Sequence, residues 1–411
     1  MGLHKFKPMP SGRMGILWTL ASVRNAALVE YGCMGHMLYA RAFLNRAGVP
    51  NACELYSTHI DETDIALGGI DRIRKTIEYI AKNNPTKVIF LLPSSVPQII
   101  GTDIPAICEE LQPEYPNVRL IPFGSGGFGV LQHRGIQDAL LLLAKSLPVK
   151  TERTWTPTFN IVGSCADLFN FHADANEIIR IMEGAFNMKH LCIMTSDTSI
   201  DNIEKMGGAH INLVLRREGE PAAKELQESF GTPYFIGRPY GIDGTIRWIE
   251  DIAQILNIAP NKDFINSQHE EVSRLISPIK PTFRHLIHQY PEVIQLSIGA
   301  HADVVQGVLG FGCEELSLPK GICWCDNPEM SSEELPCFTE EQVMKNISEH
   351  KKGIIMANSE VLEWSGHSRM LQISNPDDKW RINPYSSPFV GFRGALNLAE
   401  LWVNEALKNM P

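Results

Sequence analysis

Nine short runs of β-branched and other apolar residues constrain the fold of this 411-residue chain most strongly, and most of them precede ten or more residues with helical periodicity. The runs lie at residues 88–92, 119–123, 159–162, 191–194, 211–215, 233–236, 293–298, 353–356 and 369–373. A helix between two strands returns the chain so that the strands pair in parallel, and parallel sheets are covered by helices on both faces. The pattern therefore predicts an α/β protein built from parallel sheets flanked by helices.

Three parts of the chain look self-contained. The first is predicted to span residues 1–150, because a polar segment with prolines follows at 148–157. The second spans residues 151–275 and the third residues 276–411. The first strands of the last two parts end in glycine, at Gly163 and Gly299. Since open α/β sheets bind ligands beyond the carboxyl ends of their strands, these strand ends are candidate ligand sites.

Composition excludes several classes of function. A formal net charge of −10 argues against nucleic acid or an anionic membrane as the main partner. No apolar run reaches the ~18 residues of a transmembrane helix, and Arg24 and Glu30 interrupt the stretch behind the basic N-terminus, so no signal peptide is expected. The nine cysteines include no C-x-x-C pair, and the spacing of Cys323 and Cys325 is poor for zinc. A reducing, cytoplasmic setting fits these features.

Residues 57–104 join two acidic turns to a strand and a proline-framed loop. The first turn contains Asp61, Glu62 and Asp64, and the second contains Asp103. This combination resembles the first domain of the nitrogenase component 1 superfamily, whose large subunits hold iron–sulfur clusters and reduce difficult substrates. Further segments similar to family motifs follow in order at residues 123–132, 159–163, 211–214, 223–234, 239–245 and 385–394. The resemblance spans most of the chain and implies three Rossmann-like domains around a central cleft.

Members of this family place three cysteines in the first domain, and these hold a cluster at the interface with a sister subunit. The first position falls on Ser11 in this chain and the third on Ser95. The second falls on His36 when the flanking glycines are aligned, and Cys33 lies three residues earlier. The resemblance therefore implies that Cys33 and His36 are metal ligands of an interface iron–sulfur cluster, [4Fe-4S] or larger. The residues implied to surround this cluster are Gly32, Gly35, Ser95, Gly126 and Gly127.

The ligands of a second, catalytic cofactor are missing. Active nitrogenase α subunits hold that cofactor with a cysteine and a histidine, and the matching positions here are Arg216 and Arg381. The resemblance therefore implies that this chain does not hold such a cofactor in that way, and nitrogen fixation is the least expected of the family's activities.

Cys33 and His36 lie on a turn that leads into a helix predicted from Met37. A helix N-terminus favours the thiolate, which is the form that binds iron, and imidazole can replace a thiolate on iron. One or two ligands cannot hold a cluster alone. In the related light-independent protochlorophyllide reductase, one subunit gives three cysteines and its partner a single non-cysteine ligand. The alternative is that Cys33 is a small buried hydrophobe and His36 a hydrogen-bonding residue at the helix start.

Four other features have a structural interpretation beside the functional one. Ser95 is either a ligand or, with Ser94, a turn that caps the next helix, which we favour. The acids around Asp61 are expected to start a helix rather than to act as general acids. The glycine loop at 124–129 lacks a phosphate-loop pattern and is expected to let backbone approach a cluster or a helix. His301 follows a predicted strand, where imidazole suits proton delivery, although a structural histidine is favoured.

Two functions follow from the resemblance. The first is a subunit of a nitrogenase-like reductase that pairs with a homologous sister subunit in an α2β2-like assembly. Such a subunit takes low-potential electrons from an ATP-dependent iron–sulfur reductase and reduces a small molecule; a methylthio-alkane reductase or a tetrapyrrole reductase is an example. The lack of a P-loop in this chain agrees with ATP being handled elsewhere. The second function is that of a non-catalytic partner subunit or a cluster-assembly scaffold.

Overall fold

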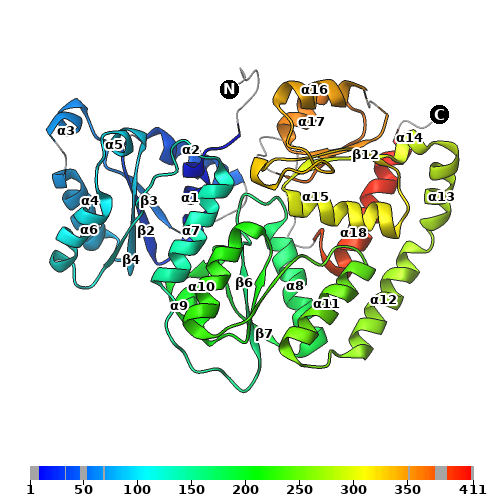
Figure 1. Cartoon of the computed structure of the whole chain (residues 1–411), viewed down its shortest axis with the longest axis horizontal. Coiled ribbons are helices and arrows are strands. Elements are labelled where there is room, and N and C mark those ends of the chain that lie inside the picture. Colours follow the sequence, from blue (N-terminus) through cyan, green and yellow to red (C-terminus); the bar gives the residue numbers. More distant parts are fainter. Residues whose placement is uncertain are drawn as a thin grey trace.

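The computed structural model describes residues 9–32, 34–46, 53–67, 70–349, 352–374 and 387–408. These residues form three four-stranded parallel sheets with helices packed on them, together with one two-stranded pair (Figure 1). The predicted α/β fold class is therefore confirmed. No helix in the described part of the chain is long and apolar enough to cross a membrane.

The first sheet has the strand order β3-β2-β4-β5. Its strands are β2 (Ala26–Tyr31), β3 (Glu54–Ser57), β4 (Val88–Pro93) and β5 (Arg119–Pro122). The helices of this part are α1 (Gly12–Leu20), α2 (Gly35–Arg46), α3 (Glu62–Leu67), α4 (Ile70–Asn83), α5 (Ser95–Ile99), α6 (Ile104–Leu111), the 3₁₀ turn Gln112–Glu114 and α7 (Gln132–Ser146). The central strands β2 and β4 are buried along their whole length, as expected for strands covered on both faces.

The acidic turn at Asp61 starts α3, as predicted. The Asp61 carboxylate accepts hydrogen bonds from the backbone N–H groups of Thr63 and Asp64, at 2.9 and 3.0 Å. The Asp64 carboxylate in turn accepts from the Asp61 N–H at 2.9 Å. This reciprocal pattern satisfies donors that the first helical turn leaves unpaired. The acids therefore have a structural explanation.

The second sheet has the order β10-β9-β6-β7. Its strands are β6 (Thr158–Val162), β7 (Lys189–Ile193), β9 (Ile211–Val214) and β10 (Tyr234–Ile236). Its helices are α8 (Phe171–Phe186), α9 (Ile200–Glu204), the 3₁₀ turns Lys205–Gly208 and Arg217–Gly219, α10 (Glu220–Phe230), α11 (Asp243–Leu256) and α12 (Lys262–Ile276). The pair of β1 (Val23–Arg24) and β8 (Thr198–Ser199) connects this part to the first.

The third sheet has the order β12-β11-β13-β14. Its strands are β11 (Leu296–Ala300), β12 (Lys320–Cys325), β13 (Ile354–Ala357) and β14 (Met370–Gln372). Its helices are α13 (Lys280–Gln289), α14 (Pro291–Ile294), α15 (Ala302–Leu309), the π-helical turn Gly310–Glu315, the 3₁₀ turn Pro328–Met330, α16 (Glu340–Glu349), α17 (Ser359–Ser365) and α18 (Gly391–Leu407).

A single hydrophobic cluster links all three sheets. It contains Phe90 of β4, Phe159 of β6 and Ile298 of β11, and each of these side chains is fully buried. Such continuous burial joins the three sheets into one packed body. The divisions proposed at residues 150 and 275 lie before β6 and in the last turn of α12. As domain boundaries they stay a prediction.

All nine predicted strands are present, but β2, β3, β12 and the short pair β1 and β8 were not predicted. β2 contains a buried acid, Glu30, and β12 contains Gly321, both of which are unfavourable in strands. A side chain at Gly321 would collide with Ser297 of the neighbouring β11, so this glycine allows the two strands to approach. The strand predicted at 293–298 begins later, at Leu296, because Pro291 opens the short helix α14.

Candidate functional site

The residues implied to surround a cluster lie where β2, β4 and β5 end, at the carboxyl edge of the first sheet. The Ser94 N–H donates to the Tyr31 carbonyl at 2.9 Å, which joins the ends of β4 and β2. A side chain at Gly32 would collide with Ser94, and one at Gly126 would collide with the Pro93 carbonyl. We call the set formed by Gly32, Ser95, Gly126, Gly127 and His36 the first-sheet edge. Its glycines let three chain segments pack closely.

Gly127 serves the approach of a neighbouring helix. It has φ +71°, a conformation that favours glycine, and a side chain there would collide with the backbone of Gly12 and Arg13 at the start of α1. The predicted close approach of backbone to a helix is therefore what the loop provides. Gly35 differs from the other glycines, because a side chain there would meet nothing within 4 Å. Packing does not explain Gly35, and a cluster-binding role for any of these glycines stays a prediction.

His36 lies in the first turn of α2, above a buried ion pair. Arg13 of α1 donates to the Glu30 carboxylate of β2, and both side chains are almost completely buried. The His36 Nδ1 atom is 3.4 Å from Glu30 Oε1 and 3.5 Å from Arg13 Nη1, while its side chain is 43% exposed. The other two terminal atoms of the ion pair, Arg13 Nη2 and Glu30 Oε2, find no hydrogen bond among the described residues. The ring is thus held through Nδ1 at a partly open position.

Ser95 is the first residue of α5, and Ser94 precedes the helix. Ser94 is the N-cap residue of α5, as the predicted turn requires, but its side chain makes no capping hydrogen bond and packs against Gly32 instead. Ser11 precedes α1 without a capping bond and pairs with Leu131 in a β-bridge. Cys33 lies outside the described residues. Within the described ranges, no group of three or more His, Cys, Asp or Glu side chains could hold a metal ion.

Exposed apolar side chains flank this edge. They are Met34 and Leu38 at the start of α2, Ile99 and Ile100 at the end of α5, and Phe128 in the glycine loop. Gln98 ties α5 to that loop, since its side-chain oxygen accepts from the Gly126 N–H at 2.9 Å. We refer to these five apolar residues as the edge patch. Contiguous apolar exposure is typical of a surface that another protein covers, and the Gln98 contact makes the end of α5 and the loop of Phe128 neighbours.

A second candidate site lies where the strands of the second and third sheets end. A cavity of about 20 Å³ is lined by the segments that follow β6, β9, β11 and β12 and by the first turn of α7. Its ionisable lining residues include His133, Asp167, Asp174, Arg216, Arg238, His301 and Asp326. The ends of the strands β6 and β11 open onto one common cavity, and ligand binding at these strand ends stays a prediction.

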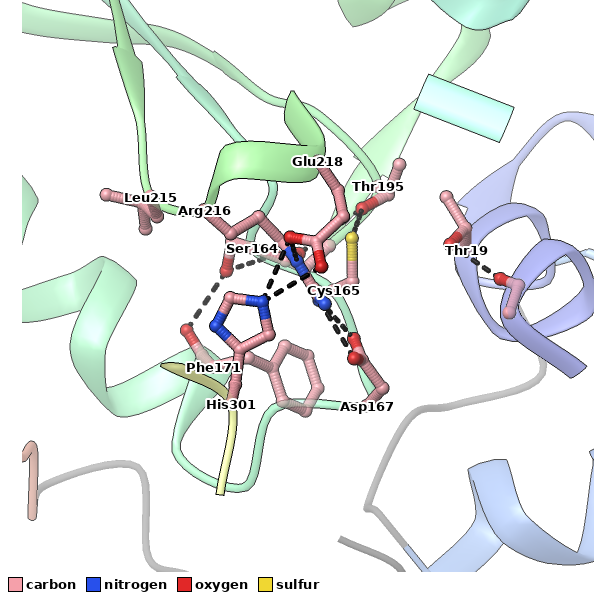
Figure 2. A network of polar contacts seen from close by, with 12 residues as sticks. Thr19, Ser164, Cys165, Asp167, Phe171, Thr195, Leu215, Arg216, Glu218 and His301 are labelled. Carbon is pink, nitrogen blue, oxygen red and sulfur yellow. Dashed lines mark hydrogen bonds and ion pairs between the residues drawn. The ribbon is translucent and has the colours of Figure 1, made fainter. Parts of the chain in front are cut away.

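Arg216 is the centre of a buried charge network at this cavity (Figure 2). Its guanidinium donates to both Asp167 carboxylate oxygens at 2.8 Å and to Glu218 Oε2 at 3.0 Å. The side chain of Arg216 is only 1% exposed. Gly163 makes room for it, since a Cβ there would lie 2.7 Å from Arg216 Cγ. Burial opposes the charge of Arg216, but the two carboxylates outweigh it and raise the pKa of the guanidinium.

His301 joins the same network as the N-cap residue of α15. Its Nε2 lies 2.9 Å from Glu218 Oε1, and its Nδ1 accepts from the Asp303 N–H at 3.3 Å. Burial alone would lower the pKa of His301, but Glu218 outweighs it and raises that pKa. A second proton would be placed on Nδ1, 3.7 Å from the Asp303 carboxylate. The predicted position at a strand end is confirmed, and the contacts favour the structural interpretation; a role in proton delivery stays a prediction.

The cavity does not fit a large metal cofactor. A volume of about 20 Å³ accommodates roughly one water molecule. The Arg216 side chain fills the position where the family's cofactor cysteine was aligned, and both of its carboxylate partners belong to this chain. Arg381, the second aligned position, lies outside the described residues.

Asp174, which lines this cavity, makes the stability of the folded protein depend on pH. Burial raises the pKa of Asp174 to about 6, against the opposing effect of Arg238. The carboxyl is neutral in both states below its unfolded pKa of 3.8, whereas above about pH 6 the folded protein must hold a buried carboxylate.

We therefore expect the difference in the free energy of unfolding between Asp174→Asn and the unsubstituted protein to change with pH. From about pH 4 to pH 7 it should shift in favour of Asp174→Asn by about 3 kcal/mol. Urea unfolding at several pH values measures this difference. Asp263→Asn, at an exposed position in the first turn of α12, is the control and should show no such trend. A difference for Asp174→Asn that stays constant across this pH range would contradict the prediction.

Comparison with known proteins decides the family. Residues 11–294 match the sequence model of the nitrogenase component 1 type oxidoreductases. The chain belongs to this family. The match covers the first two sheets and ends just before β11. The third sheet of this nitrogenase component 1 type chain is supported by structural similarity: a nitrogenase structure, "Cp1 at pH 6.5", has a TM-score of 0.78, 16% identity, and covers 99% of this chain and 94% of that one.

Two curated members of the family are similar in sequence. The nitrogenase iron-molybdenum cofactor biosynthesis protein NifE of Clostridium pasteurianum is 26% identical over 53% of this chain and 47% of its own length. A light-independent protochlorophyllide reductase subunit from Nostoc punctiforme is 27% identical over 64% of this chain and 54% of its own. The chain spans about half the length of the curated relatives it matches.

The sequence did not reveal the partners of Arg216 in this nitrogenase component 1 type chain. Asp167 and Glu218 follow different strands, and His301 is 83 residues beyond Glu218. A weak signal existed, because Arg216 and Glu218 come directly after a buried strand, β9. Charged residues at such strand ends are favoured to line a site.

Proposed function

We propose that this chain is a subunit of a nitrogenase-like reductase whose iron–sulfur cluster lies between the first-sheet edge and a homologous sister subunit. The observation that carries this proposal is the combination of glycine-packed strand ends, a partly open His36 and the adjacent edge patch. The described residues offer no complete ligand set of their own, so a cluster here requires ligands from a partner chain. An α2β2-like assembly follows from this proposal.

Within this proposal, Cys33 and His36 supply this chain's ligands. The buried Arg13–Glu30 pair engages His36 Nδ1, which leaves Nε2 to bind iron, in the manner of metal-bound histidines whose other nitrogen contacts a carboxylate. A bound cluster would supply one-electron transfer at low potential. The electrons would come from a separate ATP-dependent iron–sulfur reductase, and a small molecule would be reduced; a methylthio-alkane reductase-like activity is the example we propose.

A second candidate function is a non-catalytic partner or a cluster-assembly scaffold. Two observations favour it. Arg216, which aligns with the family's cofactor cysteine, is held by a carboxylate of this chain, and one of the similar proteins is named as a cofactor biosynthesis protein. Transfer of a cluster to an acceptor protein, without electron uptake from the ATP-dependent reductase, would distinguish this function from the first.

Co-expression with the sister subunit tests the proposed assembly. We expect a complex with two copies of each chain, measured by light scattering after size exclusion, with iron, sulfide and an EPR signal in the anaerobic complex. Because a charge in an apolar contact is costly, Phe128→Asp in the edge patch should separate the subunits. Trp155→Asp, at a fully exposed position outside the patch, is the matched control. A stable monomer with its full iron content would overturn the proposal.

A further inference from the structure

Two cysteines of the third sheet lie side by side although eleven residues separate them in the sequence. Cys325 ends β12, and its N–H donates to the Pro336 carbonyl at 3.0 Å. This bond pairs the end of the strand with the segment that carries Cys337. Cys337 follows Pro336 directly, so it is one residue from this backbone contact, and a disulfide requires a Cα separation of ~4.4–6.8 Å. The interaction between the two thiols lowers the pKa of Cys325 and raises that of Cys337.

The loop between these cysteines is held in a defined shape. The Cys337 N–H donates to the Ser331 hydroxyl at 2.9 Å, and the Leu335 N–H donates to the Ser332 hydroxyl at 3.1 Å. The Cys325 thiol is buried and contacts the Asn327 carbonyl at 3.3 Å, whereas Cys337 is half-buried. The pair therefore has one thiol that solvent reaches and one that is protected behind it.

The other described cysteines lack this arrangement. Cys53, Cys108, Cys165 and Cys192 are buried, and burial raises the pKa of each of them. Cys323, on the same strand as Cys325, is also buried with a raised pKa, and its thiol contacts the Gly321 carbonyl. Among the described cysteines, the lowered pKa of Cys325 is the exception, and lowered pKa marks the thiols that react.

We propose that Cys325 and Cys337 form a redox-active dithiol that a small-molecule disulfide oxidises to an intramolecular disulfide. In the first step one thiolate attacks the external disulfide, whose S–S bond breaks and releases one thiol. In the second step the remaining cysteine attacks the mixed disulfide, so that the Cys325–Cys337 bond forms and a second thiol leaves. The external disulfide gains two electrons and the two thiol protons, and the pair loses them.

This oxidation would act on the central cavity. Asp326 and Asn327 follow Cys325 directly; Asp326 lines the cavity, and the Asn327 side chain donates to Glu218 Oε1 at 3.2 Å. The Asp326 N–H also donates to the Ala300 carbonyl, next to His301. A disulfide at Cys325 fixes the base of the loop that contributes these groups. The inference does not depend on a cluster at the first-sheet edge.

The test equilibrates the full-length chain, without a cluster, in buffers with increasing ratios of oxidised to reduced glutathione. Free thiols are then alkylated, and the protein is digested and mapped by mass spectrometry. We expect a peptide that contains the Cys325–Cys337 bond, with loss of alkylation at both positions and recovery after dithiothreitol. The unsubstituted protein gives this result by itself, so the test does not rely on a variant that folds.

Variants identify the pair. Cys337→Ser should abolish the cross-linked peptide and leave Cys325 open to alkylation or to a mixed disulfide with glutathione. Cys323→Ser, on the same strand, should oxidise as the unsubstituted protein does. For this control the thiols are first trapped, and the protein is then unfolded so that every free thiol can be alkylated. Complete alkylation of Cys325 and Cys337 at every glutathione ratio would overturn the inference. A cross-link of Cys325 to a different cysteine would overturn it as well.

Discussion

Arg216→Ala is expected to lower the free energy of unfolding by about 3–5 kcal/mol, because it leaves the Asp167 and Glu218 carboxylates buried without their cation. The arginine satisfies both carboxylates at 2.8–3.0 Å, and each would face a low-dielectric interior without it. Urea unfolding at neutral pH measures the effect. Arg217→Ala is the control, since that neighbouring side chain is 64% exposed and lies 3.6 Å from Asp303. Exposed pairs of this kind contribute at most about 1 kcal/mol.

The outcome also bears on what the cavity can hold. A loss in the free energy of unfolding below about 1 kcal/mol for Arg216→Ala would mean that water enters and solvates the carboxylates. The cavity would then open more readily than its volume indicates. The central site would then be available to a ligand, and the interpretation of Arg216 as a purely structural replacement for a cofactor ligand would fail. A large loss supports a cavity that is closed by its own charges.

The second large effect is expected at the first-sheet edge. In the complex with the sister subunit, His36→Ala and Cys33→Ala should each lower the iron content and weaken the EPR signal, if each residue binds the cluster. Neither change should alter the thermal unfolding of the cluster-free chain much. His36 is 43% exposed, so its truncation removes little buried surface. Iron per complex, EPR and the unfolding temperature are measured together.

Matched substitutions separate a ligand from a packing residue. His269→Ala, on an exposed face of α12, and Cys108→Ala, at a buried thiol of α6, should keep full iron. Loss of the cluster in one of the two edge variants alone names the ligand. Full iron and an unaltered spectrum in both would mean that the partner chain holds the cluster without this turn, and that the turn is structural.

At the first-sheet edge, the structure agrees with one expectation from the sequence and adds one buried contact. The order of the family motifs predicted that Ser95 and the glycine loop belong together, and both lie at the carboxyl ends of neighbouring strands. The Arg13–Glu30 pair beneath His36 was not predicted. Its members are seventeen positions apart in the sequence, and a basic residue in a glycine-rich N-terminal segment gives no sign that it will be buried.

The class of fold and most of the helices and strands could be predicted from the sequence, although several strands, among them β2, β3 and β12, could not. Runs such as 88–92 and 211–215 are short and β-branched, and the helices between them carry apolar residues at three- and four-residue spacing, as Ile136, Leu140 and Leu143 do in α7. These are local properties, so neighbouring residues suffice to read them. The same locality applies to α10, which ends before Gly231, a glycine with φ +68°.

The contacts among the charged residues could not be predicted from the sequence, because packing between sheets brings them together. Asp167, Arg216 and His301 follow strands of two different sheets, and they become neighbours because the carboxyl ends of those sheets face one cavity. Cys325 and Cys337 likewise meet through the pairing of β12 with the chain near Pro336. Whether a buried charge is paired depends on residues far away in the chain, and the local sequence does not show which of them will lie next to it. Packing between the sheets therefore determines which charged residues become neighbours at the central cavity.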